Sequence, residues 1–182
     1  MQLYDTNCTA ISSPAYTEGS FLAEFSPYSK LSYEHMLSSR YALYNAAPHG
    51  RDWSLDRSAT LLLSRLDVQG PMSVSELADA LDLDISTIHR QVAAAMKAGL
   101  IERIPDPDGG QARKHRPTPE GLARLREEFD NRDHLSRQIT ESWDPAELET
   151  FLTLLIRFNQ DLESLRGSTW PRPYPTGRDE SH

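Results

Sequence analysis

Cysteine is nearly absent from the chain, because Cys8 is the single one among 182 residues. A lone cysteine cannot close a disulfide within the chain, which is typical of a reducing compartment. No segment approaches the roughly eighteen consecutive apolar residues of a transmembrane helix, so we expect no contact with a membrane. The first residues also lack the basic segment and apolar core of a secretory signal. These absences predict a cytoplasmic protein.

Signatures of catalytic and metal sites are missing as well. The six histidines are scattered and form no Cys/His cluster at the spacing of a metal site. The sequence has no glycine-rich phosphate loop, no nucleophile elbow and no zinc-protease helix. We therefore expect a protein that is not an enzyme and that needs no metal ion or cofactor.

The formal net charge of −8 is distributed unevenly. Residues 85–126 contain eight lysines and arginines against four acidic residues, a balance of +4 that leaves −12 for the rest of the chain. A basic patch on an acidic body creates an oriented field that turns one face toward DNA. The uneven distribution thus favours a nucleic-acid partner, which the net charge alone would argue against.

The stretch from Met72 to Arg103 predicts two short helices followed by a strand. Ser73 precedes Glu76 by three residues, the capping-box pattern at the start of a helix. Asp84 is the expected N-cap of the second helix. Apolar residues recur at helical spacing through both segments: Leu77, Ala78 and Leu81, then Ile85, Ile88, Val92, Ala95 and Met96.

The outward face of the second helix consists of small, hydroxyl-bearing and basic side chains and carries no carboxylate. Its members are Ser86, Arg90, Ala93, Ala94 and Lys97, with Thr87 and His89 on the flanks. Such a face can lie against phosphates and base edges. Two helices joined by a tight turn, the second presenting this face, predict a helix-turn-helix.

A β-hairpin is expected directly after these helices. Leu100–Ile104 predicts the first strand and Gln111–Arg116 a second, basic strand. Prolines and glycines between them form a tip that cannot continue a strand. A hairpin in this position is the wing of a winged helix.

Four further helices complete the predicted fold. We expect a helix over 27–46 after Ser26, one over 55–66 capped by Ser54, a long one over 119–141 and a last one that ends near Leu165. The last helix has more apolar surface than a terminal helix in water can expose. Its apolar residues therefore predict a dimer interface: Leu148, Phe151, Leu152, Leu155, Ile156 and Leu162.

The predicted fold is mainly α with a small β-hairpin wing, in which N- and C-terminal helices form a dimerisation region. Residues 1–25 are expected to be a flexible arm, and the proline-rich residues 167–182 a disordered tail. Between them, residues 51–118 form the winged helix-turn-helix, while 26–50 and 119–166 contribute the dimerisation helices.

The order SVSELADAL, STIHRQVAAAMKAGLIER, DPDGG and TPEG resembles the MarR family of bacterial transcription regulators. The resemblance implies that Arg90 enters the major groove of DNA and that Ser86, Thr87, His89 and Lys97 lie nearby. Family wings commonly carry an arginine at the tip for the minor groove, but a glycine stands at that place here. Arg113, Lys114 or Arg116 could take over the role.

The resemblance also implies a small aromatic ligand, bound between the first two helices and the wing-side long helix, with Tyr41, Tyr44 and Trp53 as candidates. The function it favours is that of a regulator that binds a near-palindromic operator as a homodimer. The alternative is a winged helix that acts on another regulator through protein contacts and does not bind DNA itself.

Overall fold

The computed structural model describes residues 26–41 and 55–176, which fall into two units. The first unit contains α1 (Pro27–Tyr41). It begins where the sequence predicts, with the Ser26 hydroxyl accepting a hydrogen bond from the Ser29 amide at 3.2 Å. The predicted continuation of this helix to residue 46 and the predicted arm over 1–25 lie outside the described residues.

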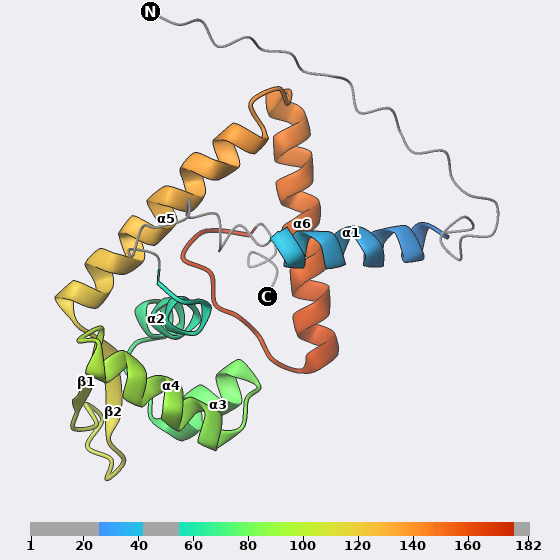
Figure 1. Cartoon of the computed structure of the whole chain (residues 1–182). Coiled ribbons are helices and arrows are strands. Elements are labelled where there is room, and N and C mark those ends of the chain that lie inside the picture. Colours follow the sequence, from blue (N-terminus) through green and yellow to red (C-terminus); the bar gives the residue numbers. More distant parts are fainter. Residues whose placement is uncertain (1–25, 42–54, 177–182) are drawn as a thin grey trace, which may run out of the picture. The chain divides into compact units, whose positions relative to one another are not determined.

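The second unit is mainly helical and contains one small antiparallel hairpin (Figure 1). Its elements in order are α2 (Arg57–Gln69), α3 (Val74–Leu81), α4 (Ile85–Lys97), β1 (Ile101–Ile104), β2 (Lys114–Pro117), α5 (Pro119–Ile139) and α6 (Pro145–Arg166). The hairpin register pairs Ile101 with Pro117 and Ile104 with Lys114. The predicted fold class, a winged helix with a small hairpin, is confirmed.

A side chain at the N-cap position accepts a hydrogen bond from the first turn in most of these helices and so determines where each one begins. α3 has the predicted capping box, in which the Ser73 hydroxyl accepts from the Glu76 amide and the Glu76 carboxylate accepts from the Ser73 amide. Asp144 and Glu147 form the same arrangement at α6. Because each box joins groups within one turn, the sequence pattern is sufficient to predict it.

Two predicted caps differ from the structure. α2 is capped by Asp56, whose carboxylate accepts from the Ala59 amide at 2.8 Å, so Ser54 is not its cap. Asp84 occupies the N-cap position of α4 but makes no side-chain capping hydrogen bond. The Asp84 backbone carbonyl instead accepts from the Thr87 amide at 2.9 Å and the Ile88 amide at 3.1 Å.

One hydrophobic core joins the helix-turn-helix, the hairpin and the start of α5. Its largest fully buried side chains are Leu62, Leu63, Leu66, Leu77 and Ile88. They come from α2, α3 and α4, and Leu125 of α5 closes the same cluster. The exposed face of α4 is thereby held on a packed support.

A close backbone approach explains the TPEG segment at the start of α5. The Thr118 hydroxyl accepts from the Gly121 amide and donates to the Gly99 carbonyl at 2.6 Å. A side chain on Gly121 would collide with the Leu100 carbonyl, so only glycine fits there. The end of α4, the first wing strand and α5 are thus joined at one point.

Several element ends differ from the predictions. β2 begins at Lys114, three residues after the predicted start, and α5 ends at Ile139. The tail was expected to be disordered from residue 167, yet residues 167–176 follow a defined path along α6. Among the described residues, no helix is long and apolar enough to cross a membrane.

Candidate nucleic-acid interface

The exposed face of α4 contains the side chains that the sequence predicts for DNA contact. Ser86, His89, Arg90 and Lys97 are exposed, and Thr87 is half-buried. The opposite face is buried through Ile88, Val92 and Ala95. The Arg90 guanidinium donates to the Thr87 hydroxyl at 3.3 Å, which orients it along the helix surface. Neither Arg90 nor Lys97 has an ion-pair partner within residues 26–41 and 55–176.

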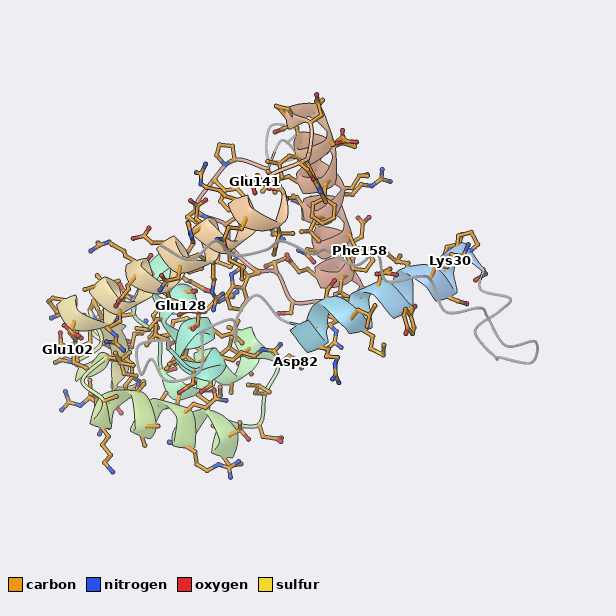
Figure 2. All side chains as sticks on the ribbon, turned by 45° about the horizontal axis from the view of Figure 1, so that its top comes forward. Lys30, Asp82, Glu102, Glu128, Glu141 and Phe158 are labelled. Atoms are coloured by element: carbon orange, nitrogen blue, oxygen red, sulfur yellow. The ribbon has the colours of Figure 1, made fainter. Side chains whose placement is uncertain are left out.

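A tight turn between α3 and α4 positions this face. Asp82 adopts a left-handed backbone conformation with φ of 52°, and its amide donates to the Ala78 and Asp79 carbonyls. The Leu83 amide then donates to the Ala78 carbonyl at 3.1 Å. Backbone hydrogen bonds therefore fix the turn to the end of α3, and Figure 2 labels Asp82 at this corner.

The three wing cations that the sequence singles out, Arg113, Lys114 and Arg116, lie in different environments. Lys114 is only 14% exposed and lies 3.3 Å from Asp106, 3.5 Å from Asp108 and 3.7 Å from Glu76. Arg116 pairs with Glu102 on the neighbouring strand at 2.8 Å. We call the group formed by Lys114, Asp106 and Glu76 the wing clamp; the Asp108 carboxylate lies at its exposed edge.

Hydrogen bonds fold the wing tip around Asp106. Its carboxylate accepts from the Asp108 amide at 3.1 Å, and its carbonyl accepts from the Gly109 amide at 3.1 Å. The Asp108 amide and the nearby Lys114 ammonium hold the pKa of Asp106 below its usual value. Burial disfavours the charge of Lys114, but its carboxylate partners outweigh this and raise its pKa. The clamp therefore joins the wing tip to the start of α3.

Of these three predicted cations, Arg113 is the one that remains available. It is exposed and, across the part of the chain that the structure describes, makes no ion pair. Its neighbour His115 is 5% exposed, and burial lowers the pKa of its imidazole and keeps it neutral. Sequence reasoning proposed three interchangeable cations, whereas the structure leaves one of them unpaired.

The predicted ligand residues do not form a described site. Tyr41 is the last residue of α1, and Tyr44 and Trp53 lie outside the described residues. The second unit contains a pocket of about 600 Å³ between α2, α5, α6 and the tail. Phe129, Trp170 and Tyr174 supply its aromatic lining. The sequence analysis did not identify Trp170 and Tyr174 as pocket residues. Two large aromatic side chains in an otherwise polar terminus were the signal that this segment packs against the helices.

The predicted dimerisation residues form an open apolar face on α6. Leu148, Phe151, Leu152, Leu155 and Leu162 are 39–49% exposed, and Ile156 is half-buried. No residue of α6 is buried within this chain. Phe158 lies on the same helix and is labelled in Figure 2.

Comparisons with known proteins agree with this geometry. The MarR family model matches residues 55–110, from the start of α2 through the wing tip. YxaD of Bacillus subtilis (strain 168), an HTH-type transcriptional regulator, is 37% identical over 134 residues, which are 74% of this chain and 94% of that protein.

Solved structures show the same fold. The reduced form of MarR from E. coli superposes with a TM-score of 0.59 at 21% identity, covering 74% of this chain and 98% of that one. PcaV from Streptomyces coelicolor, in complex with its natural ligand, gives 0.54 at 19% identity, covering 76% and 98%. From the family match and the identity to YxaD, we conclude that the chain belongs to the MarR family of winged helix-turn-helix transcription regulators.

Proposed function

We propose that this protein binds a near-palindromic DNA operator as a homodimer and that a small aromatic ligand modulates the complex. The observation that carries the proposal is the exposed, carboxylate-free face of α4, with Arg90 and Lys97 unpaired within the described chain. A recognition helix of this kind enters the major groove, where arginine reads base edges and hydroxyls contact phosphates.

The wing supplies a second contact. Arg113 projects from the hairpin without an ion-pair partner among the described residues, so it is free to enter the minor groove or lie on the backbone. Lys114 and Arg116 are already paired with carboxylates and would have to give up these pairs to contact DNA. Arg113 therefore replaces the arginine that the wing tip lacks.

A second copy of the chain is the proposed partner of α6. The exposed apolar face of α6 is too large for a helix that faces water. A two-fold axis would present two α4 helices to successive major grooves, with half-site centres about 10–10.5 bp apart. The ligand would act by favouring a dimer in which these helices are wrongly spaced. PcaV, a structural neighbour that was solved in complex with its natural ligand, supports the presence of a ligand in the proposal.

Fluorescence anisotropy tests the proposal directly. The full chain is titrated against duplexes that tile its own upstream region, at two salt concentrations. We expect one near-palindromic tile to bind tightly, with an affinity that falls as salt rises because counterions are released. Arg90→Ala should weaken that complex by about tenfold to hundredfold.

The matched control is Arg57→Ala, which removes the same charge from an exposed residue in the first turn of α2. It should leave the affinity for the operator close to that of the wild type. Equal, weak binding to every tile would contradict the proposal and favour a winged helix that binds a protein partner.

A further inference from the structure

The segment that follows α6 turns back on the molecule. Gly167 adopts a left-handed conformation with φ of 67°, which ends the helix and reverses the chain. Residues 167–176, drawn in red after α6 in Figure 1, swing away from the end of α6 toward α2 and return to α6, where the Gln160 side-chain amide donates to the Thr176 hydroxyl. We call residues 167–176 the strap.

An ion pair between Arg172 of the strap and Glu163 of α6 anchors the strap. The Arg172 guanidinium donates to both Glu163 oxygens, at 2.6 and 3.2 Å, and the Trp170 amide donates to the same carboxylate at 3.1 Å. Burial alone would raise the pKa of Glu163, but these donors outweigh it and lower the pKa. Glu163 is therefore a charged anchor on α6.

Arg65 of α2 connects the strap to the winged helix through two contacts. This α2 residue is 6% exposed, and its guanidinium donates to the Thr169 carbonyl at 2.9 Å. It also lies over the Trp170 ring, 5.1 Å from the centroid. Burial lowers the pKa of Arg65, while Glu163 opposes that shift. The strap thus supplies a carbonyl acceptor and an aromatic ring to this buried arginine, whose Nε has no hydrogen-bond partner among the described residues.

Apart from the strap, α6 makes few contacts with the winged helix formed by α2, α3, α4 and the hairpin. No residue of α6 is buried, and the pocket of about 600 Å³ separates it from α2 and α5. At the end of α6, Arg166 pairs with Asp82 at the turn between α3 and α4, at 3.2 Å. Both this pair and the strap leave from the same end of α6.

Because α5 is long, a small rotation at its junction with α6 would displace its far end by several ångströms, and these contacts oppose that rotation. α5 has 21 residues, which span about 30 Å at the rise of an α-helix. A rotation of about 10° at the corner between α5 and α6 would move the far end of α5 by about 5 Å. That displacement exceeds the spacing of successive base pairs, which is about 3.4 Å.

We propose that the strap is a positioning element that fixes the winged helix against α6 and thereby sets the spacing of the two recognition helices in the dimer. The proposal rests on the proposed function for its effect on DNA. Its structural half, a fixed distance between α4 and α6 within one chain, does not depend on DNA binding.

The structural half is tested by a distance measurement in the full chain. Spin labels are placed at Ala98→Cys, just after α4, and Glu149→Cys on α6, in a Cys8→Ser background diluted with unlabelled protein. Both labelled positions are exposed. We expect a narrow distance distribution in the parent chain and a broad one in Arg172→Gln and Trp170→Ala. The matched control, Arg157→Gln, removes an exposed arginine of α6 and should keep the distribution narrow.

The DNA half uses operators whose half-sites are one base pair closer or farther apart than in the best tile. The parent chain should prefer the native spacing, and Arg172→Gln should lose about five- to tenfold of that preference. Hydrogen exchange over residues 167–176 confirms that the variant frees the strap, and circular dichroism confirms that it folds.

Each outcome is decisive. A narrow distance distribution in a variant with a freed strap would overturn the positioning role. Broadening with unchanged spacing preference would overturn the link to operator spacing. A parent chain that binds no tile would contradict the proposed function and leave the distance measurement to judge the strap by itself.

Discussion

Lys114 and Arg113 are adjacent in the sequence, yet they have different roles in the structure. The Lys114 ammonium is held by the carboxylates of the wing clamp, while the Arg113 guanidinium is exposed. If Lys114 contacted a phosphate, it would have to break these ion pairs, and the lost interaction energy would weaken its contribution to DNA binding. We therefore infer that Lys114 shapes the wing and that Arg113 contacts DNA.

Asp106→Asn tests these two roles, because they predict opposite changes in the affinity for DNA. Removal of a negative charge near DNA should tighten binding on charge alone. If the wing clamp positions Arg113, the substitution instead frees the wing tip and weakens the complex by about fivefold or more. Anisotropy against the operator at fixed salt measures the difference.

Asp108→Asn is the matched control for Asp106→Asn. Its carboxylate is 85% exposed and touches Lys114 at 3.5 Å, so the same charge is removed with little effect on the clamp. We expect its affinity to equal or slightly exceed that of the wild type. Tighter binding by both variants would show that charge alone decides the effect and that the wing clamp does not position Arg113.

At the scale of the element, α3 depends on its first turn. The helix has only eight residues, too few to be stable by itself, so its cap and its packing decide whether it forms. Its Glu76 both closes the capping box and faces Lys114 of the wing. Hydrogen bonds with Ser73 lower the pKa of Glu76 and keep it charged for both contacts.

Ser73→Ala should lower the free energy of unfolding by ~1 kcal/mol, because the Glu76 amide loses its acceptor. Urea denaturation followed by circular dichroism measures the change. Ser75→Ala is the control, since Ser75 is an exposed residue within the same helix. Its effect should stay within about 0.5 kcal/mol, and equal losses in both variants would argue against the cap.

At the scale of the whole molecule, α6 carries the apolar face that we propose as the dimer interface. Its exposed large apolar residues remain 37–57% exposed along one side of the helix in the isolated chain, with Leu165 at 86%. The opposite side carries polar residues that face solvent, among them Thr153 and Arg157. Such a helix is half of an interface, which a second copy can complete by symmetry.

Leu152→Glu should convert the dimer to a monomer, because it places a charge at the centre of the apolar face. Light scattering coupled to size-exclusion chromatography measures the mass. Thr153→Glu introduces the same charge about 100° around the helix and should remain dimeric. A monomeric wild type, or a dimeric Leu152→Glu variant, would show that this face is not the interface.

The sequence by itself determined the features that arise within one helical turn or one hairpin. The Ser73–Glu76 box and the burial of Ile88, Val92 and Ala95 on one side of α4 were predicted correctly, because the residues involved lie three or four positions apart. The cap of α2 was misplaced because Ser54 and Asp56 are both good caps and stand two residues apart. Local patterns identify such elements and leave their ends uncertain by a few residues.

The tertiary structure alone decided which charges are paired and which are available. Lys114 meets Glu76 of α3, and Arg65 meets Thr169 at a separation of 104 residues in the chain. No periodicity or spacing encodes such pairs, because they depend on the path of the folded backbone. For the same reason the strap, predicted as a disordered tail, became an ordered contact once α2 and α6 were brought within its reach.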